Sequence, residues 1–438
     1  MRNTRNLLPE KASSPTLDAA LVVLATILIV TLVYAPNAWA GAKFKTLYKF
    51  KGGKDGDSPD AGLTFDQAGN LYGTTQSGGA DGAGTVFQLT PNQNGGWTES
   101  VLYSFCSLAN CADGGYPTAG LIFDRAGNLY GTTSDGGAHG AHTDNGTVFQ
   151  LTPNQNGGWT EHVLHSFCSR TNCADGKDPT AGLTFDQAGN LYGTTYGGGA
   201  GSGGGTVFQL TPNQNGSWTE HVLHSFCSQT NCADGSYPSA GLIFDPVGNL
   251  YGTTLTGGAQ TSGTVFQLTP NQNGGWTEHV LHSFCSRTNC ADGQLPYAGL
   301  IFDQVGNLYG TTYTGPSGGT VFQLTPNQNG GWTEHVLHSF CSRTNCADGE
   351  FPFAGLILDR AGNLYGTTVA GGTQNFGTVF QLTPNQNGGW TEHVLHAFLD
   401  KPGAQPFAGL ILDEAGNLYG TSAGDFEMTF GSVFEITP

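Results

Sequence analysis

The chain has few charged residues, and basic residues are especially scarce. Asp, Glu, Lys and Arg make up 11% of its 438 residues, and 33 acidic against 15 basic residues give a formal net charge of −18. Nucleic acids and anionic membranes bind through cationic surfaces, so the composition disfavours both as partners. Because so little of the chain is charged, the composition also argues against a disordered, solvated polypeptide.

Long apolar runs are absent except near the N-terminus. The one such run, residues 19–34, follows three basic residues and precedes Ala-Trp-Ala at 38–40, a small-x-small cleavage site. This pattern predicts a signal peptide over residues 1–40. An uncleaved anchor is the alternative, because the run is near the lower length limit of a membrane span. We expect no membrane span after cleavage and an extracytoplasmic protein that is secreted, periplasmic or at the cell surface.

A helical period of 3.6 residues is also absent, and repetition takes its place. The stretch Gly-Asn-Leu-Tyr-Gly-Thr-Thr begins at Gly69 and returns six times at intervals of 54 to 62 residues, the last copy ending in Ser422. A period in this range indicates repeated supersecondary units. The 69 glycines, with aromatic residues at fixed spacing, favour short strands joined by tight turns.

Each repeat contains four strand-like runs. In the first copy they are residues 61–66, 70–75, 84–90 and 97–105, which we name strands A, B, C and D. All four are rich in aromatic and β-branched residues and are bounded by Gly, Pro or Asn. The A–B connection, Asp-x-x-Gly-Asn, suits a type I turn followed by a left-handed glycine. Each repeat is therefore expected to form one antiparallel meander sheet.

The two ends of the repeat region predict how the sheets are arranged. Residues 44–50 align with strand D, whereas the chain ends at residues 431–438, which align with strand C. An N-terminal strand that completes the last sheet would remove its free edge. We therefore predict an all-β fold, a seven-bladed β-propeller over residues 41–438, with four antiparallel strands per blade.

The repeated pattern Asp-x-x-Gly-Asn-Leu-Tyr-Gly-Thr-Thr, followed by Gly-Thr-Val-Phe-x-Leu-Thr-Pro, resembles a named family. It looks like the Gloeo/Verruco (GloVer) tandem repeat of exported bacterial proteins, and the resemblance covers residues 46–438. The resemblance implies an extracytoplasmic, propeller-like protein. It implies no known activity.

Ten cysteines form five Cys-x4-Cys pairs in the connections from strand D to the next strand A. In an oxidising compartment such pairs are expected to be disulfides, each closing its own loop. A metal site is the alternative, but one isolated pair per loop cannot fill a tetrahedral site. The five pairs are Cys106/Cys111, Cys168/Cys173, Cys227/Cys232, Cys285/Cys290 and Cys341/Cys346.

Other residues suggest metal ligands or catalysis only weakly. His139, His142 and Asp144 lie with Asp135 in one long loop, but a solvated loop is the favoured interpretation. The turn aspartates and the Asp-Gly pairs before six of the seven A strands are interpreted as turn caps, since calcium needs six or more oxygens. We therefore predict no cofactor. Calcium is the alternative, and the residues give no support for it.

Five His-Val-Leu-His motifs occur in strand D, of which His162/His165 is one. Residues i and i+3 of a strand point to opposite faces, so the two histidines are not expected to bind one ion. No Ser/His/Asp or Cys/His arrangement has a supporting context. We therefore predict no catalytic residue, and an enzyme is the less favoured class.

The copies differ mainly in the B–C and D–A loops, which a meander places at one face of the disc. A face that varies on a repeated scaffold is a candidate interaction surface. Blades five to seven concentrate aromatic and acidic residues there, although some of the rings could instead fill the core of the closure blade. The candidate binding residues are Tyr297, Tyr313, Phe351, Phe353, Phe376, Phe407, Asp425, Phe426 and Glu427.

The expected function is therefore an exported binding or interaction propeller that contacts its ligand through the B–C/D–A face. Aromatic rings beside carboxylates suit a carbohydrate or a protein or peptide. One alternative is a propeller hydrolase or lyase with a site at the channel mouth, with or without the assistance of a metal. The other is a structural spacer at the cell surface. The fold alone does not choose among them.

Overall fold

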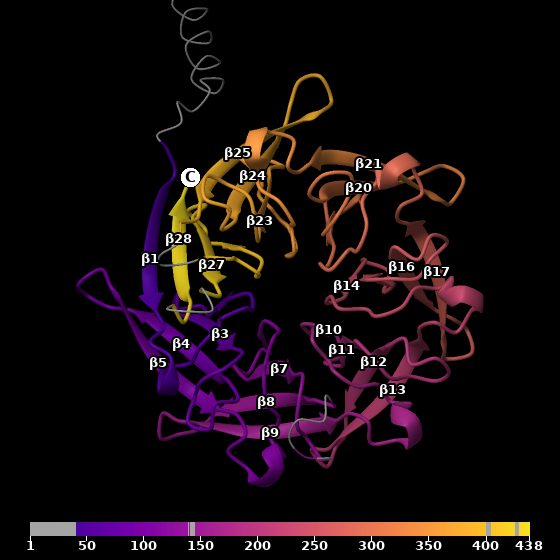
Figure 1. Cartoon of the computed structure of the whole chain (residues 1–438). Coiled ribbons are helices and arrows are strands. Elements are labelled where there is room, and N and C mark those ends of the chain that lie inside the picture. Colours follow the sequence, from indigo (N-terminus) through magenta and orange to yellow (C-terminus); the bar gives the residue numbers. More distant parts are fainter. Residues whose placement is uncertain (1–40, 139, 141–144, 400–403, 425–428) are drawn as a thin grey trace, which may run out of the picture. The chain divides into compact units, whose positions relative to one another are not determined.

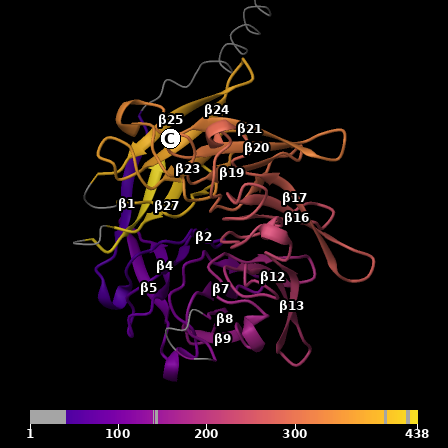
Figure 2. The same ribbon diagram turned by 45° about the vertical axis from the view of Figure 1, so that its right-hand side comes forward.

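The computed structural model describes residues 41–138, 140, 145–399, 404–424 and 429–438. The predicted signal peptide, residues 1–40, therefore lies outside the described residues. The unit from Ala42 to Pro438 consists of seven four-stranded antiparallel sheets arranged around a ring as a β-propeller (Figures 1 and 2). The predicted all-β, seven-bladed fold is confirmed. None of the helices in the described part of the chain is long and apolar enough to cross a membrane.

Each of the first six blades contributes its strands in chain order, from A on the inner side of the ring to D on the outer side (Figure 1). Blade one contains β2 (Thr64–Phe65), β3 (Leu71–Thr75), β4 (Thr85–Pro91) and β5 (Trp97–Ser104). Blade two contains β6 (Ile122–Phe123), β7 (Leu129–Thr133), β8 (Thr147–Pro153) and β9 (Trp159–Ser166). Blade three contains β10 (Thr184–Phe185), β11 (Leu191–Thr195), β12 (Thr206–Pro212) and β13 (Trp218–Ser225). Blade four contains β14 (Ile243–Phe244), β15 (Leu250–Thr254), β16 (Thr264–Pro270) and β17 (Trp276–Ser283). Blade five contains β18 (Ile301–Phe302), β19 (Leu308–Thr312), β20 (Thr320–Pro326) and β21 (Trp332–Ser339). Blade six contains β22 (Ile357–Leu358), β23 (Leu364–Thr368), β24 (Thr378–Pro384) and β25 (Trp390–Ala397).

Blade seven is assembled from both ends of the repeat region. It contains β26 (Ile411–Leu412), β27 (Leu418–Ser422), β28 (Ser432–Thr437) and, as its outer strand, β1 (Lys43–Lys49). β1 pairs antiparallel with β28, so that Phe44 lies opposite Ile436. Figure 1 shows the indigo β1 alongside the yellow β28. The predicted closure by an N-terminal strand is confirmed.

Short 3-10 turns occur in the D–A loops, and five of them end at the second cysteine of a pair. They are η1 (Gly53–Asp55), η2 (Ala109–Cys111), η3 (Thr171–Cys173), η4 (Thr230–Cys232), η5 (Thr288–Cys290) and η6 (Thr344–Cys346). All five predicted disulfides are formed, and no free cysteine remains among the described residues.

The repeated Gly-Asn-Leu-Tyr-Gly-Thr-Thr stretch has a scaffold role. A Cβ atom on Gly73 would lie 2.7 Å from the Phe87 ring of strand C, so only glycine leaves room for that ring. The hydroxyl of Thr74 donates to the carbonyl of Ala119 on the next blade, at 3.2 Å. The equivalent bond from Thr421 to Ala61, at 3.1 Å, joins blade seven to blade one. The same residues therefore build each sheet and tie it to its neighbour.

Strand A is shorter than predicted. The expected run 61–66 pairs regularly only at Thr64 and Phe65 in β2. The preceding residues turn toward the adjacent blade, as the bond to the Ala61 carbonyl shows. The turn that follows is as predicted: Oδ1 of Asp66 accepts the backbone N–H groups of Ala68 and Asn70.

The hydrophobic core lies between neighbouring sheets. One cluster joins Val148 and Phe167 of blade two to Leu191 and Phe208 of blade three, and the other interfaces repeat it. Because every blade shares its core with two others, the ring closure also completes two cores: Leu47 packs toward blade one, whereas Phe44 packs toward blade six.

Candidate functional site

The B–C and D–A loops meet at one end of the blades, as predicted. Backbone hydrogen bonds join them in pairs, of which Asp57 with Ser77 is one. The residue before the proline of each D–A loop has a positive φ, from 55° to 60° in the seven copies. Such a backbone is costly for residues other than glycine and is often found at functional sites. These seven residues are Ser58, Tyr116, Asp178, Tyr237, Leu295, Phe351 and Gln405.

The strained residue connects two blades through its backbone. The N–H of Phe351 donates to the carbonyl of Gly318 on the preceding blade, and its own carbonyl accepts the N–H of Val369. The proline and one further side chain follow immediately. This backbone geometry sets the position of the residue that follows the proline. The type of that residue differs from blade to blade.

Those variable side chains surround a cavity of about 340 Å³. Because all seven blades contribute to its wall, the cavity lies on the axis of the ring, at the mouth of the channel. All of the lining residues are half-buried. They are Asp60, Gln76, Thr118, Thr180, Tyr196, Ser239, Tyr297, Phe353 and Phe407.

The cavity wall has an aromatic half and a polar half. Tyr297 stacks on Phe353 with ring centroids 4.7 Å apart, and Phe353 meets Phe407 edge-on at 5.6 Å. On the other side the wall consists of the short hydroxyl side chains of blades two to four, together with Gln76, Asp60 and one further ring, Tyr196 of blade three. The hydroxyl of Ser239 donates to the carbonyl of Tyr297 at 3.3 Å, which connects the two halves.

The aromatic residues predicted from the sequence separate into two groups. Tyr297, Phe353 and Phe407 line the cavity, and two more rings stand behind them: Tyr313 stacks on Phe351 at 5.0 Å and meets Phe353 edge-on at 6.0 Å. Five predicted residues are thus brought together, although whether they bind a ligand stays a prediction.

The remaining candidates do not join this group. Phe376 packs against the core between blades six and seven, because the closure of the ring places a buried cluster beside its loop. Asp425, Phe426 and Glu427 lie outside the described residues. So do the candidate metal ligands His139, His142 and Asp144.

Asp60 is the residue that the sequence did not single out. Its Oδ1 atom is buried and has no hydrogen-bond partner among the described residues. Burial, and then repulsion from Asp57, raises the pKa of the Asp60 carboxyl to about 7. A signal was present in the sequence: in the Pro-x-Ala-Gly segment of the seven copies, Asp60 is the one charged residue at the position after the proline.

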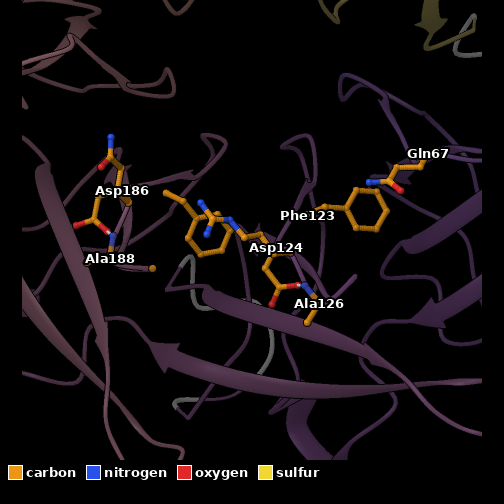
Figure 3. Close-up of a pocket in the computed structure, with 10 residues that line it drawn as sticks. Gln67, Phe123, Asp124, Ala126, Asp186 and Ala188 are labelled. Carbon is orange, nitrogen blue, oxygen red and sulfur yellow. Dashed lines mark hydrogen bonds between the residues drawn. The ribbon is translucent and has the colours of Figure 1, made fainter.

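Two larger cavities lie at the opposite ends of the sheets, among the A–B turns. One, of about 700 Å³, is lined by Gln67 and by the turns of blades two and three (Figure 3), and the other, of about 430 Å³, by those of blades six and seven. Their aspartates are occupied in scaffold bonds: Asp124 accepts from the backbone of Ala126 at 2.8 Å. Because the same repeated turn residues line both cavities, the two are weaker candidates for a binding site than the 340 Å³ cavity.

The histidines of strand D require a correction. A bulge places His162 opposite Gln150 and His165 opposite Val148, so the two share a face instead of pointing apart. They still form no metal site in the described part of the chain. His165 lies 3.4 Å from the fully buried Asp175, and the Ser169 hydroxyl donates to the same carboxylate at 2.7 Å. A catalytic relay needs the histidine between the serine and the aspartate. Here Asp175 lies between His165 and Ser169, so the three do not form such a relay.

The buried aspartates before strand A act as loop anchors. Asp175 also accepts the backbone N–H groups of Ser169 and Arg170. The contact with His165, followed by the bonds from Ser169 and Arg170, lowers the pKa of Asp175 despite its burial. In the described residues the one group with the spacing of a metal site is Cys341, Cys346 and Glu350, whose cysteines are joined in a disulfide.

Comparison with known proteins gives a family and a set of distant fold neighbours. The model of the Gloeobacter/Verrucomicrobia repeat matches residues 32–174, 97–318 and 277–438. No curated protein matches the chain. Among solved structures, the chain is similar to the periplasmic gluconolactonase PpgL of Pseudomonas aeruginosa, with 15% identity, 84% of this chain and 99% of that chain covered, and a TM-score of 0.46.

Two further solved structures are similar to the chain, with comparable sequence identity and TM-score. PorZ, a surface component of the type-IX secretion system of Porphyromonas gingivalis, has 15% identity and a TM-score of 0.43, and the match covers 82% of this chain and 44% of PorZ. A putative oxidoreductase (glucose dehydrogenase) of Thermus thermophilus has 14% identity and a TM-score of 0.41, with 91% and 100% covered. At these values the neighbours carry no conclusion about activity.

Proposed function

We propose that this chain, which belongs to the Gloeobacter/Verrucomicrobia repeat family, is an exported binding protein that takes a small polar ligand with one apolar side into its channel mouth. The end of a carbohydrate chain is the ligand class that fits best. The supporting observation is the division of the 340 Å³ cavity into an aromatic half and a hydroxyl-bearing half.

A sugar ring matches both halves of this wall. Its C–H face packs on aromatic rings, here Tyr297, Phe353 and Phe407, while its hydroxyl groups bond to short polar side chains. The cavity volume lies within the range of small-molecule sites. Because the ring scaffold is nearly identical in every blade, the asymmetry of the mouth is not required by the fold, which supports a role in recognition.

Export is the second part of the proposal. Five disulfides close five equivalent loops, and such bonds persist in oxidising compartments. The acidic surface, with a net charge of −18, favours solubility there. We propose a secreted, periplasmic or cell-surface location, with carbohydrate as the partner and neither nucleic acid nor membrane.

A glycan array probed with the purified exported protein tests the proposal. We expect selective binding that is weakened about tenfold or more by Phe353→Ala or Phe407→Ala, because each removes a ring from the cavity wall. Phe430→Ala is the matched control, since Phe430 is 41% exposed and does not line the cavity. Binding to no glycan, or equal binding by all four proteins, would contradict the proposal.

A hydrolase or lyase in the same cavity is the second candidate, and Asp60 favours it. A carboxyl group with a pKa of about 7 is suited to general acid catalysis near neutral pH. In that case Asp60→Asn would abolish turnover of a bound glycan and leave its binding intact. Unchanged glycans after prolonged incubation with the wild-type protein would exclude this candidate.

A further inference from the structure

The wall of the cavity contains the carboxyl group of Asp60, which has no cationic partner among the described residues. We infer that its ligand carries a positively charged amino or ammonium group, and that Asp60 binds this group where the polar and aromatic halves of the wall meet. The inference rests on the proposed function, since it concerns the ligand of the same cavity. It adds the chemical feature that selects that ligand.

The carboxylate of Asp60 serves no purpose in the scaffold. The six equivalent positions of the other blades hold Thr, Thr, Ser, Tyr, Phe and Phe, although the residue before the proline has a similar positive φ in all seven blades. Within the described ranges, Asp60 has no ion-pair partner, and Oδ1 accepts no hydrogen bond. Native proteins rarely bury an unpaired charge, because desolvation is costly. A buried carboxyl group without a partner in a cavity wall is therefore best explained by a group that arrives with the ligand.

A neighbouring carboxylate also disfavours the ionised form of Asp60. Asp57, in the same loop, is the charged group whose repulsion acts on Asp60, and it adds to the effect of burial in raising the pKa of the Asp60 carboxyl. A bound cation would oppose this rise in the pKa of Asp60, since opposite charge favours the ionised form. The excess of acidic residues in the whole chain would also attract cations toward the mouth.

The aromatic wall suits the same group. Phe407 occupies the position equivalent to Asp60 in the adjacent blade seven, and Phe353 and Tyr297 continue the wall. Ammonium groups are attracted to aromatic rings within about 6 Å, and rings combined with a carboxylate recognise organic cations. A neutral sugar would use the rings and hydroxyls but would leave the charge of Asp60 unpaired. An aminated sugar or a quaternary ammonium compound would use all three.

Matched pairs of probes test the charge alone. Choline is compared with 3,3-dimethylbutan-1-ol, in which carbon replaces the charged nitrogen, and glucosamine is compared with glucose, each titrated by calorimetry into the full-length exported protein. We expect at least one cation to bind about tenfold or more tightly than its neutral partner. Preference for choline identifies a quaternary ammonium ligand, and preference for glucosamine identifies an amino sugar.

Two variants show whether Asp60 is responsible. Asp60→Asn should lower the affinity for the cation about tenfold or more, toward that of its neutral partner, and a cooperative thermal unfolding transition shows that the variant is folded. Asp81→Asn is the control, because Asp81 is an exposed carboxylate in the B–C loop of the same blade and does not line the cavity. It should retain the preference.

The inference is overturned if the neutral partners bind as tightly as the cations, if Asp60→Asn keeps the preference, or if none of the four probes binds. The proposed function is judged separately. Glycan binding that is lost in Phe353→Ala but unchanged in Asp60→Asn would support a carbohydrate-binding mouth and reject the cationic ligand.

Discussion

The Nη2 atom of Arg170 lies 2.6 Å from Oε2 of Glu220, and this ion pair joins the D–A loop after blade two to strand D of blade three. The glutamate side chain is 2% exposed, and the arginine also donates to its backbone carbonyl at 3.2 Å. Two other interfaces repeat the pair, Arg287 with Glu334 and Arg343 with Glu392. The remaining glutamates at this position have no arginine.

The first prediction concerns such an unpaired interface. Gln229 occupies the arginine position opposite Glu278, and Oε1 of Glu278 is buried without a partner among the described residues. Gln229→Arg should therefore pair with this carboxylate and raise the free energy of unfolding by about 1–3 kcal/mol. Denaturant unfolding of the purified variant and the wild type measures the change.

A double-mutant cycle supplies the control. In a Glu278→Gln background the same arginine has no charge to pair with, so the gain should disappear. An equal gain in both backgrounds would mean that the introduced arginine acts through other contacts.

The second prediction concerns pH. Glu161 faces Leu108 in place of an arginine, and burial, with added repulsion from Asp113, raises its pKa to about 8. A carboxyl with a raised pKa binds its proton more tightly in the folded state than in the unfolded chain. Its contribution to stability is therefore complete below about pH 4.5 and is lost as the pH rises to about 8.

Glu161→Gln mimics the protonated side chain and should not lose this stability. The variant and the wild type should have similar stability near pH 4.5, and the variant should be the more stable at pH values above 8. Thermal unfolding at intervals across this range measures the difference. A constant difference at every pH would show that Glu161 does not titrate with the expected pKa.

Local chemistry explains why much of the fold could be predicted from the sequence. Each turn, strand and disulfide is specified within one repeat, as with Asp66 and Asn70 or Cys168 and Cys173, and the repetition supplies seven consistent examples. The closure followed from the match of residues 44–50 to strand D. The aromatic cluster could be predicted because its members occupy variable positions of the same face.

The features that the sequence did not specify depend on three-dimensional arrangement. The bulge in strand D, which sequence alternation does not show, moves His165 to the face of His162. Phe376 lies beside a core that exists only after the ring closes. Asp60 and Phe407 are far apart in the chain, and only the ring brings them to one cavity. A binding cavity built from one residue per blade is therefore difficult to recognise from spacing alone.

The third prediction tests the closure of the ring. Leu47 of β1 is 9% exposed and packs in the cluster shared with blade one, so Leu47→Ala should reduce the free energy of unfolding by about 2–4 kcal/mol. Lys49→Ala on the same strand is the control, because Lys49 is exposed and its substitution should change stability by less than about 0.5 kcal/mol. Chemical unfolding distinguishes the two, and equal stability would mean that β1 contributes little to blade seven.

The final prediction separates the loop anchors from the disulfides that they accompany. Asp175 accepts the N–H and hydroxyl of Ser169 and the N–H of Arg170, which holds the loop around Cys168 and Cys173. Asparagine retains one acceptor oxygen and places an amide donor against the others, so Asp175→Asn should loosen this loop alone. We expect the Cys168–Cys173 bond to be reduced faster by dithiothreitol than in the wild type, as measured by alkylation and peptide mass spectrometry.

The molecule contains its own control for this experiment. The Cys227–Cys232 loop keeps the equivalent anchor, Asp234, whose Oδ2 accepts from Ser228 at 2.7 Å. Its rate of reduction should not change in the variant, because each loop is anchored within its own repeat. If all five disulfides instead became reducible together, Asp175 would be stabilising the whole ring and not one loop, and the local-anchor interpretation would be wrong.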